Sequence, residues 1–217
     1  MPAGRARQKG EKDRAAIPQD QDHGERKQKE RGENAGKLIP VRICFKKKDA
    51  DALDSTRKKT DFIANALKSC GLEAPVLCGR AEALPEVIPA ADRVLCDVPC
   101  TGLGGGSKPD AMLNRTEEDM MELASLQLSI LLNAADRVKP GGSLVYSTCT
   151  VSRRENAENA RKFLEKRPDF TAEDCSFLVP GRPAGAPDFS PFLQLFPNTD
   201  GIDGFFIARF IKGSNRV

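Results

Sequence analysis

The sequence predicts an α/β protein built on a doubly wound sheet. Short apolar runs at 76–78 and 94–96 are typical of buried parallel strands. Segments with apolar residues three or four positions apart, as in helices, alternate with such runs. This alternation favours a parallel sheet with right-handed crossovers. The length of 217 residues suits one good-sized domain with a tail.

Composition excludes several classes of protein. No run reaches the roughly eighteen apolar residues that cross a bilayer, and the N-terminus lacks the apolar core of a signal peptide. The seven cysteines include no C-x-x-C pair, and His23 is the single histidine. A metal site and a disulfide framework are therefore disfavoured, and we expect an intracellular protein with reduced thiols, no metal and no membrane contact.

Residues 1–48 differ from the rest of the chain. They carry 14 Lys/Arg and 7 Asp/Glu, whereas residues 49–217 carry 20 and 24. Ile17 is the only large aliphatic residue between Met1 and Lys37, so we expect a disordered basic tail. An arm that gathers nucleic acid by charge is the functional alternative, but the interspersed acids weaken its field and favour a solvated tail.

The first half of the folded part contains the following predicted elements. Alternating apolar residues predict a short strand at 41–45. Apolar residues at helical spacing predict a helix from about residue 57, which Gly71 ends as a C-terminal cap. Buried strands follow at 76–78 and 94–96.

The next predicted helix has a capping signal at its start. Thr116 followed by Asp119 is typical of an N-cap, and apolar residues then step by three or four as far as Val138. The Pro-Gly-Gly sequence at 140–142 is expected to break this helix before a strand at 143–147.

The last predicted helix begins at a capping box formed by Ser152 and Glu155, and Pro168 ends it. A loop rich in proline and glycine, from about 180 to 203, then leads to a final strand at 205–211. Strand and helix thus alternate to the end of the chain.

Polar segments follow two of the predicted strands. Asp97, Pro99 and Cys100 come directly after the strand at 94–96, and Cys149 comes directly after the strand at 143–147. In doubly wound sheets, ligands lie at the carboxyl ends of the strands. Proline ends the ladder there, because it has no backbone N–H to donate. We therefore expect one carboxylate and two thiols to share a pocket.

A thiol in such a pocket suits addition to an electron-poor carbon, because the thiolate is strongly nucleophilic. Cytosine and uracil have such a carbon at ring position 6. Addition there makes ring carbon 5 electron-rich, so that it can attack an electrophilic methyl group. The adduct must then lose its carbon 5 proton and eliminate the sulfur, which a second thiol can assist. Either cysteine alone is more typical of core packing than of catalysis.

From about Leu53 to Ile211, the chain resembles RNA cytosine-5 methyltransferases of the RsmB/Nop type, and the bacterial ribosomal RNA enzymes most of all. The resemblance implies a Rossmann-like class I S-adenosylmethionine-dependent methyltransferase sheet, and an RNA substrate, in the first place ribosomal RNA. The segments that carry it, in the family's order, are Asp97–Gly104, Lys108–Asp110, Gln127, Lys139–Thr150, Glu155–Asn156 and Asp203–Phe206.

The resemblance also implies roles for individual residues. Cys149 is the nucleophile on ring carbon 6, and Cys100 helps to release the methylated product. Asp97 lies between cofactor and base, and Asp54 holds the ribose hydroxyls of S-adenosylmethionine. Two alternatives stay open. DNA cytosine-5 methyltransferases use the Pro-Cys cysteine as nucleophile, which would exchange the two thiols, and Asp54 could instead be an acid favoured by a helix dipole.

One departure from the family concerns cofactor binding. A glycine-rich loop should follow the first strand, before Asp54, but residues 38–49 contain no glycine. Such a loop lets the backbone approach the methionine part of the cofactor closely. We therefore interpret 1–48 as a tail or foreign segment and 49–217 as a partial methyltransferase domain. An inactive RNA-binding or scaffold paralogue, or a fragment with an exposed sheet edge in place of its first strand, are the alternatives.

Overall fold

The computed structural model describes residues 41–43, 51–84, 86, 88–105, 115–183 and 186–214. All of them belong to one compact unit, 37–217. The predicted tail therefore lies outside the described residues except for Val41–Ile43, which form a strand and not a disordered tail, and disorder of the rest stays a prediction. Within the described part of the chain, no helix is long and apolar enough to cross a membrane.

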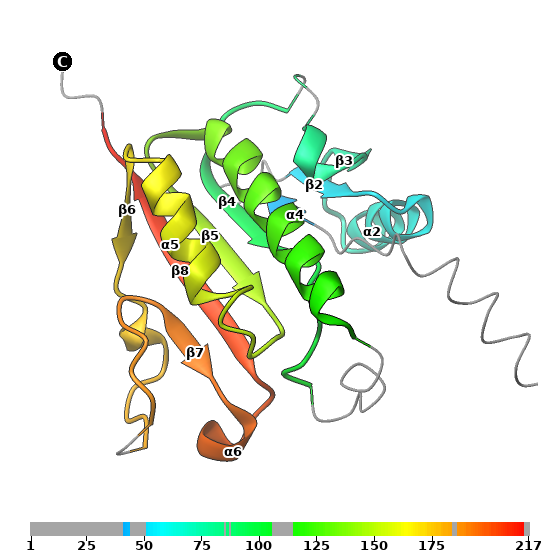
Figure 1. Ribbon diagram of the computed structural model, residues 1–217. Coiled ribbons are helices and arrows are strands. Elements are labelled where there is room, and N and C mark those ends of the chain that lie inside the picture. Colours follow the sequence, from blue (N-terminus) through cyan, green and yellow to red (C-terminus); the bar gives the residue numbers. More distant parts are fainter. Residues whose placement is uncertain are drawn as a thin grey trace, which may run out of the picture. The chain divides into compact units, whose positions relative to one another are not determined.

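An eight-stranded sheet confirms the predicted α/β architecture (Figure 1). The strand order is β3-β2-β1-β4-β5-β8-β6, and β7 also pairs with β8. β2 and β3 are parallel, as are β4 and β5, whereas β8 is antiparallel to β5, β6 and β7. The strands are β1 (Val41–Ile43), β2 (Asp51–Asp54), β3 (Val76–Cys78), β4 (Ala91–Asp97), β5 (Val138–Thr148), β6 (Phe170–Glu173), β7 (Leu193–Leu195) and β8 (Phe205–Lys212).

Helices α4 and α5 cover one face of the sheet, and α2 packs against β2 and β3 (Figure 1). The predicted cap of α4 is confirmed: Asp119 N donates to Thr116 Oγ1 at 3.1 Å, and Thr116 N donates to the Asp119 carboxylate at 2.8 Å. The helical elements are α2 (Arg57–Ser69), η1 (Ala81–Ala83), α4 (Glu117–Asp136), α5 (Ala157–Lys166), η2 (Ser176–Leu178) and α6 (Pro197–Asp200).

Strand β1 lies between β2 and β4. If the first strand of the sheet were missing, an exposed edge would be expected at this position. Val41 lies opposite both Leu53 and Cys96, and Ile43 lies opposite Asp51. The prediction of an exposed edge at this position is therefore wrong, and the first strand is altered rather than missing. β1 runs antiparallel to both neighbours, so its amino end lies at the edge of the sheet where β2 and β4 end.

Two predicted boundaries are also wrong. β5 begins at Val138 rather than at residue 143, so the Pro-Gly-Gly sequence lies within the strand. Pairing with β4 shifts register there, between Ala91 and Arg93, and this irregularity accommodates a residue pattern that breaks helices. In addition, α5 begins at Ala157, later than the predicted capping box.

Aromatic side chains fill the core between α5 and the sheet. Phe163 of α5 is fully buried, and its ring centroid lies 4.6 Å from that of Phe210 and 5.3 Å from that of Phe170. Phe206 and Phe210 are buried on β8, because alternate residues of a strand face the same side. These contacts fix α5 against the strand that borders β5.

We expect Phe163→Ala to lower the free energy of unfolding by about 3–5 kcal/mol, because it removes a buried ring and leaves a cavity. Urea denaturation followed by circular dichroism measures the loss. Phe62→Ala is the matched control, since the Phe62 side chain is 72% exposed, and it should change stability by less than about 0.5 kcal/mol. Similar losses in both variants would contradict the role of Phe163 in the core.

Candidate functional site

Both polar segments singled out in the sequence lie at the carboxyl ends of adjacent parallel strands. Asp97 at the end of β4 pairs in register with Ser147 of β5. Ser147 Oγ donates a hydrogen bond of 2.9 Å to Asp97 Oδ1, and Val98 N donates to the Ser147 carbonyl at 3.2 Å. The two loops that follow therefore start side by side.

The two predicted thiols meet at this edge of the sheet. The sulfurs of Cys100 and Cys149 lie 3.2 Å apart, within hydrogen-bond distance, and both residues are half-buried. The hydrogen bond with Cys149, together with burial, raises the pKa of the Cys100 thiol far above its ordinary value. Cys100 therefore holds its proton more tightly than an ordinary thiol, and either sulfur can be the donor in this contact.

Two glycines join the cysteine loops to the segment before β8. Gly104 N donates to the Cys149 carbonyl at 3.1 Å, and Gly204 N donates to the Gly104 carbonyl at 2.8 Å. A Cβ atom on Gly104 would lie 2.1 Å from the Gly204 carbonyl oxygen, so no larger residue fits. Both glycines lie in the segments that carry the family resemblance, but nothing in the sequence indicated that they contact each other.

Glu155 is a site residue whose place the sequence did not reveal. It is fully buried, and it accepts hydrogen bonds from Thr101 N at 2.9 Å, Thr101 Oγ1 at 2.6 Å and Gln127 Nε2 at 2.9 Å. The predicted capping box forms only in part: Glu155 N donates to Ser152 Oγ at 3.5 Å, but the Glu155 carboxylate points into the site, and Asn156 is the N-cap of α5. A buried carboxyl group needs such partners, since it has lost its water.

Gln127 continues the polar cluster beneath the loop that carries Cys100. Its Nε2 also donates to the Pro99 carbonyl at 2.8 Å, and its Oε1 accepts from the Tyr146 hydroxyl at 3.1 Å and from Asn159 Nδ2 at 3.2 Å. Burial raises the pKa of Tyr146 well above its ordinary value, which keeps its hydroxyl a donor. Every polar group of the Gln127 side chain thus has a partner.

Asp54, the predicted ribose ligand, lies at the carboxyl end of β2 and is 2% exposed. Its Oδ1 accepts a hydrogen bond of 2.7 Å from Thr56 N, just before α2. Its Oδ2 makes no hydrogen bond with the described residues, although the Lys59 ammonium lies 3.6 Å away as an ion pair. One oxygen thus serves the start of α2, as the alternative interpretation expects, and the other can accept from a ligand.

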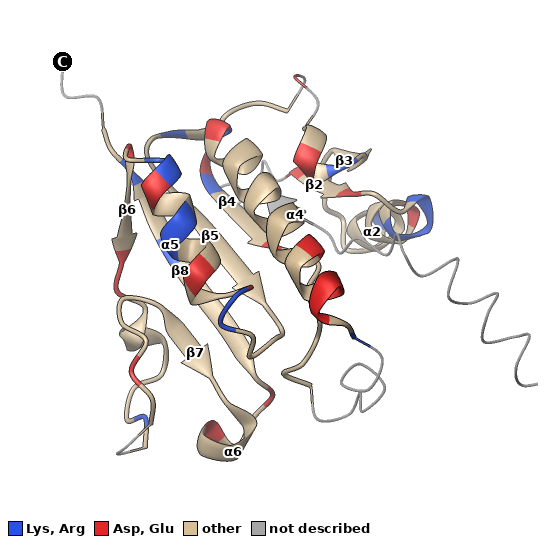
Figure 2. Cartoon of the chain, in the orientation of Figure 1, with Lys and Arg blue, Asp and Glu red and all other residues tan. Residues whose placement is uncertain are grey.

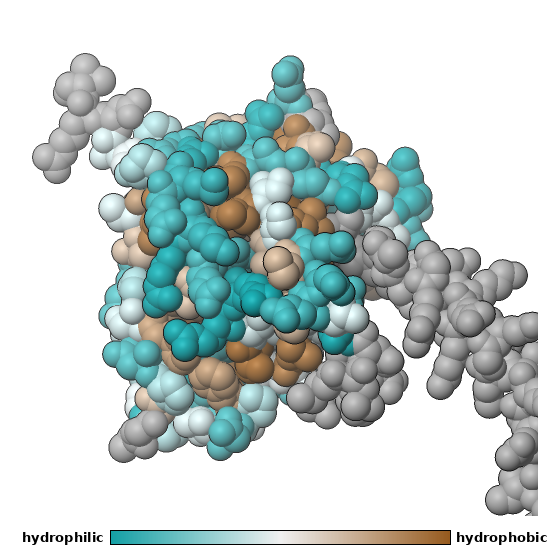
Figure 3. Space-filling model, in the orientation of Figure 1, coloured by the Kyte–Doolittle hydropathy of each residue, from teal (hydrophilic) through white to brown (hydrophobic). Residues whose placement is uncertain are grey.

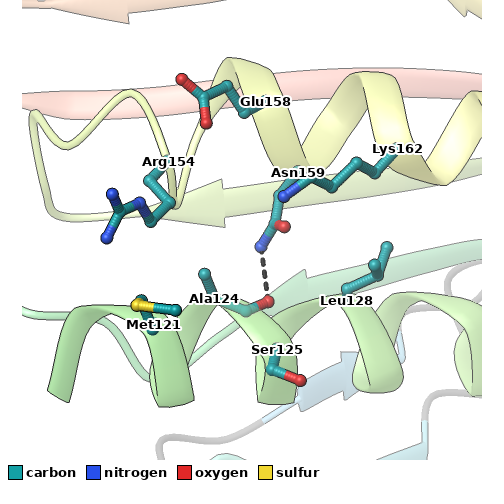
Figure 4. A pocket seen from close by; sticks show the side chains of 8 residues that line it. All are labelled: Met121, Ala124, Ser125, Leu128, Arg154, Glu158, Asn159 and Lys162. Atoms are coloured by element: carbon teal, nitrogen blue, oxygen red, sulfur yellow. Dashed lines mark hydrogen bonds between the residues drawn. The ribbon is translucent and has the colours of Figure 1, made fainter. Parts of the chain in front are cut away.

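A cavity of about 340 Å³ lies elsewhere, between α4 and α5 (Figure 4). In its wall, Asn159 Nδ2 donates to the Ala124 carbonyl at 2.8 Å. Figure 2 shows acidic residues at the start of α4 and both basic and acidic ones along α5, and Arg154 pairs with Glu117 at 3.1 Å. This face is mainly hydrophilic with small separate apolar patches (Figure 3). The cavity includes none of the predicted site residues; its lining is Met121, Ala124, Ser125, Leu128, Arg154, Glu158, Asn159 and Lys162.

The sequence matches the family model described as 16S rRNA methyltransferase RsmB/F over residues 41–211. It is 37% identical over 188 residues to the probable ribosomal RNA small subunit methyltransferase B of Bacillus subtilis, which covers 82% of this chain and 41% of the relative. Identity to the ribosomal RNA small subunit methyltransferase B of Salmonella arizonae is 33% over 180 residues, with 82% and 40% covered. The chain thus spans about two fifths of the length of these relatives.

Among solved structures, the fold is similar to that of NSun6 from Pyrococcus horikoshii with SFG. The TM-score is 0.64 at 28% sequence identity, and the match covers 76% of this chain and 41% of that one. It is also similar to a methyltransferase homologue from Pyrococcus horikoshii, with a TM-score of 0.60 at 27% identity, covering 75% and 52%. The class I methyltransferase sheet implied by the sequence is therefore confirmed.

Replacing Cys149 with alanine should shift the pH dependence of Cys100 alkylation to lower pH, because the hydrogen bond that contributes most to the raised pKa of Cys100 is lost. Iodoacetamide labelling followed by peptide mass spectrometry gives the rate at each pH. Cys175→Ala is the control, since Cys175 is buried in a separate core cluster, and it should leave the Cys100 profile unchanged. An unshifted profile in Cys149→Ala would contradict the coupling.

Proposed function

The chain belongs to the 16S rRNA methyltransferase RsmB/F family, and from this membership we propose that it methylates carbon 5 of a cytosine in ribosomal RNA. The observation that carries the proposal is the 3.2 Å contact between the Cys100 and Cys149 sulfurs at the carboxyl ends of β4 and β5. Addition to a pyrimidine ring needs a nucleophile such as a thiol, a second thiol can assist release of the ring, and two thiols in contact can divide these tasks.

In the proposed reaction, the Cys149 thiolate forms a bond to ring carbon 6, and the electron pair of the 5,6 double bond moves to carbon 5. Bound S-adenosylmethionine would supply the electrophilic methyl group that carbon 5 then attacks. Methyl transfer leaves the demethylated cofactor behind. The carbon 5 proton then passes to solvent, its electron pair restores the double bond, and the bond between carbon 6 and sulfur breaks to return Cys149 as a thiolate. The S–H group of Cys100 can donate to the departing Cys149 sulfur, because the two sulfurs are already in contact.

The Ser-Thr-Cys-Thr sequence at 147–150 supports this division of roles over the exchanged one, because the cysteine of that motif is the nucleophile in the family that the chain resembles. A thiol that retains its proton is a poor nucleophile, but its S–H group can still donate a weak hydrogen bond to a departing thiolate. Cys149 is therefore the proposed nucleophile, and Cys100, whose sulfur is in contact with it, the group that assists release. The target cytosine would have to leave its stack to reach the sulfurs, as in other enzymes that act on a base.

Asp54 and Asp97 are the proposed cofactor ligands. The residues present fit the ribose end of S-adenosylmethionine, because the buried Oδ2 of Asp54 can accept a hydrogen bond from a ribose hydroxyl. The similarity to NSun6, whose crystal structure contains the S-adenosylmethionine analogue SFG, supports the same cofactor here. Asp97 lies at the same edge of the sheet, at the end of β4, which β1 separates from β2.

The reversed direction of β1 favours a second candidate function, that of an inactive RNA-binding or scaffold protein. In this fold, a parallel first strand leads into the loop that contacts the cofactor. Here the carboxyl end of β1 lies opposite Asp51, at the start of β2, and therefore at the edge away from the thiols. The carboxyl end of β1 therefore lies at the wrong edge of the sheet for that contact.

We expect Cys149→Ser to abolish methyl transfer and Cys100→Ser to let a covalent RNA adduct accumulate, because release then lacks its thiol. Transfer of a labelled methyl group measures the first effect, and a denaturing gel of protein with RNA measures the second. Cys70→Ser is the control, since Cys70 is exposed on the helix α2 side of the sheet and should change neither result. An adduct in Cys149→Ser but none in Cys100→Ser would reverse the roles.

Calorimetric titration separates the enzyme from the scaffold. Asp54→Asn should weaken binding of S-adenosylmethionine by about ten- to a hundredfold, because a charged acceptor of the ribose hydroxyls is lost. Asp92→Asn, at an exposed carboxylate, should bind like the parent chain. The absence of heat from the parent at millimolar cofactor would remove support for methyl transfer and favour the scaffold.

A further inference from the structure

Two consecutive residues reach the two loops that carry the thiols. Glu155 and Asn156 lie just before the first turn of α5, and their exposed fractions are 0% and 1%. The Glu155 side chain hydrogen-bonds to the loop that follows β4, and the Asn156 side chain to the loop that follows β5. One short stretch of backbone therefore contacts both halves of the thiol pair.

Glu155 acts on the residues beside Cys100. It accepts from both the backbone N–H and the hydroxyl of Thr101, the residue after Cys100. Gln127 donates to Glu155 and, through the same amide nitrogen, to the carbonyl of Pro99, the residue before Cys100. Both neighbours of Cys100 are thus bound to one buried carboxyl and amide pair.

Asn156 acts in the same way on the residues beside Cys149. Its Oδ1 accepts from the Thr148 hydroxyl at 2.6 Å, and its Nδ2 donates to the Thr150 carbonyl at 2.9 Å. A further bond of 2.6 Å from Nδ2 to Gln194 Oε1 fixes the orientation of the amide. The residues before and after Cys149 are therefore also bound to one buried side chain.

We propose that Glu155 and Asn156 are positioning residues that together set the separation of the Cys100 and Cys149 sulfurs. Because the two side chains come from adjacent residues, the spacing of the loops follows from one rigid piece of backbone. The inference rests on the proposed function, because it takes the two sulfurs to be the groups that act on RNA. Such positioning is chemically significant, since a misplacement of about 1 Å can cost roughly a hundredfold in rate.

Disulfide exchange with glutathione measures the spacing without RNA or cofactor. The two protein thiols pass two electrons to oxidised glutathione, forming the bond between Cys100 and Cys149. Their two protons go to the two molecules of reduced glutathione produced. The ratio of disulfide-bonded to reduced protein at equilibrium gives the effective concentration of one thiol relative to the other. Peptide mass spectrometry distinguishes a bond between Cys100 and Cys149 from bonds that involve the other cysteines.

We expect Glu155→Gln and Asn156→Asp each to lower this effective concentration by about tenfold or more. The first variant puts an amide N–H₂ group where donors already point, and the second puts an oxygen against the Thr150 carbonyl. Thr101→Val, which loses only a hydroxyl, should lower it by roughly fivefold, and Thr101→Ser should restore the parental value.

Asp200→Asn is the matched control. Asp200 is also a buried carboxylate, and it accepts from Phe196 N at 2.8 Å and pairs with Arg182 at 3.0 Å, but its segment carries neither cysteine. It should keep the effective concentration within about twofold of the parent. If Asp200→Asn lowered the effective concentration as much as Glu155→Gln, the inference would be overturned, because the thiol pair would then respond to any loss of stability in the fold.

Parental values in folded Glu155→Gln and Asn156→Asp would equally overturn it. If either variant fails to fold, Thr101→Val and Thr148→Val test the same two loops with smaller changes, and parental values in both of these variants would also overturn the inference. Where the parent methylates RNA, kcat should fall with the effective concentration while the KM for RNA stays constant. A parent that methylates no RNA refutes the proposed function alone, because the thiol equilibrium is measured without substrate.

Discussion

The parallel pairing of β4 with β5 is the constraint on which the rest of the site depends. Because these strands run in the same direction and in register from Val94 to Asp97, their carboxyl ends meet at one edge. Each strand is followed at once by a segment carrying a cysteine. The buried aromatic residues of α5 and β8 hold this strand pair in place, so the core and the site share one scaffold.

The site itself is organised by polar groups that are buried beneath it. Burial leaves a carboxyl or amide group without water, so each must be bound to a defined partner. Glu155, Gln127 and Asn156 have such partners, and several of these partners flank Cys100 or Cys149. The requirement that hydrogen bonds be satisfied thus becomes a geometric requirement on the two loops, which links the stability of the fold to the placement of the thiols.

Much of this arrangement could be predicted from local patterns in the sequence. The cap at Thr116, the strands at 76–78 and 205–211, and the convergence of Cys100 and Cys149 all follow from spacing and from the rules of parallel sheets. The role of Glu155 could not be predicted in this way, because its position three residues after Ser152 is equally typical of a capping box. Its true partners, Thr101 and Gln127, are 54 and 28 residues away in the chain.

The contact of Gly104 with Gly204 and Cys149 is made by backbone groups alone. Peptide N–H and carbonyl groups do not titrate and carry no net charge, so neither acidity nor ionic strength acts on this junction directly. The loops that carry Gly104, Cys149 and Gly204 should therefore stay hydrogen-bonded to one another under any solvent condition in which the sheet remains folded. Salt and pH can thus alter the ionisation of the two thiols while the backbone of the surrounding loops keeps its conformation.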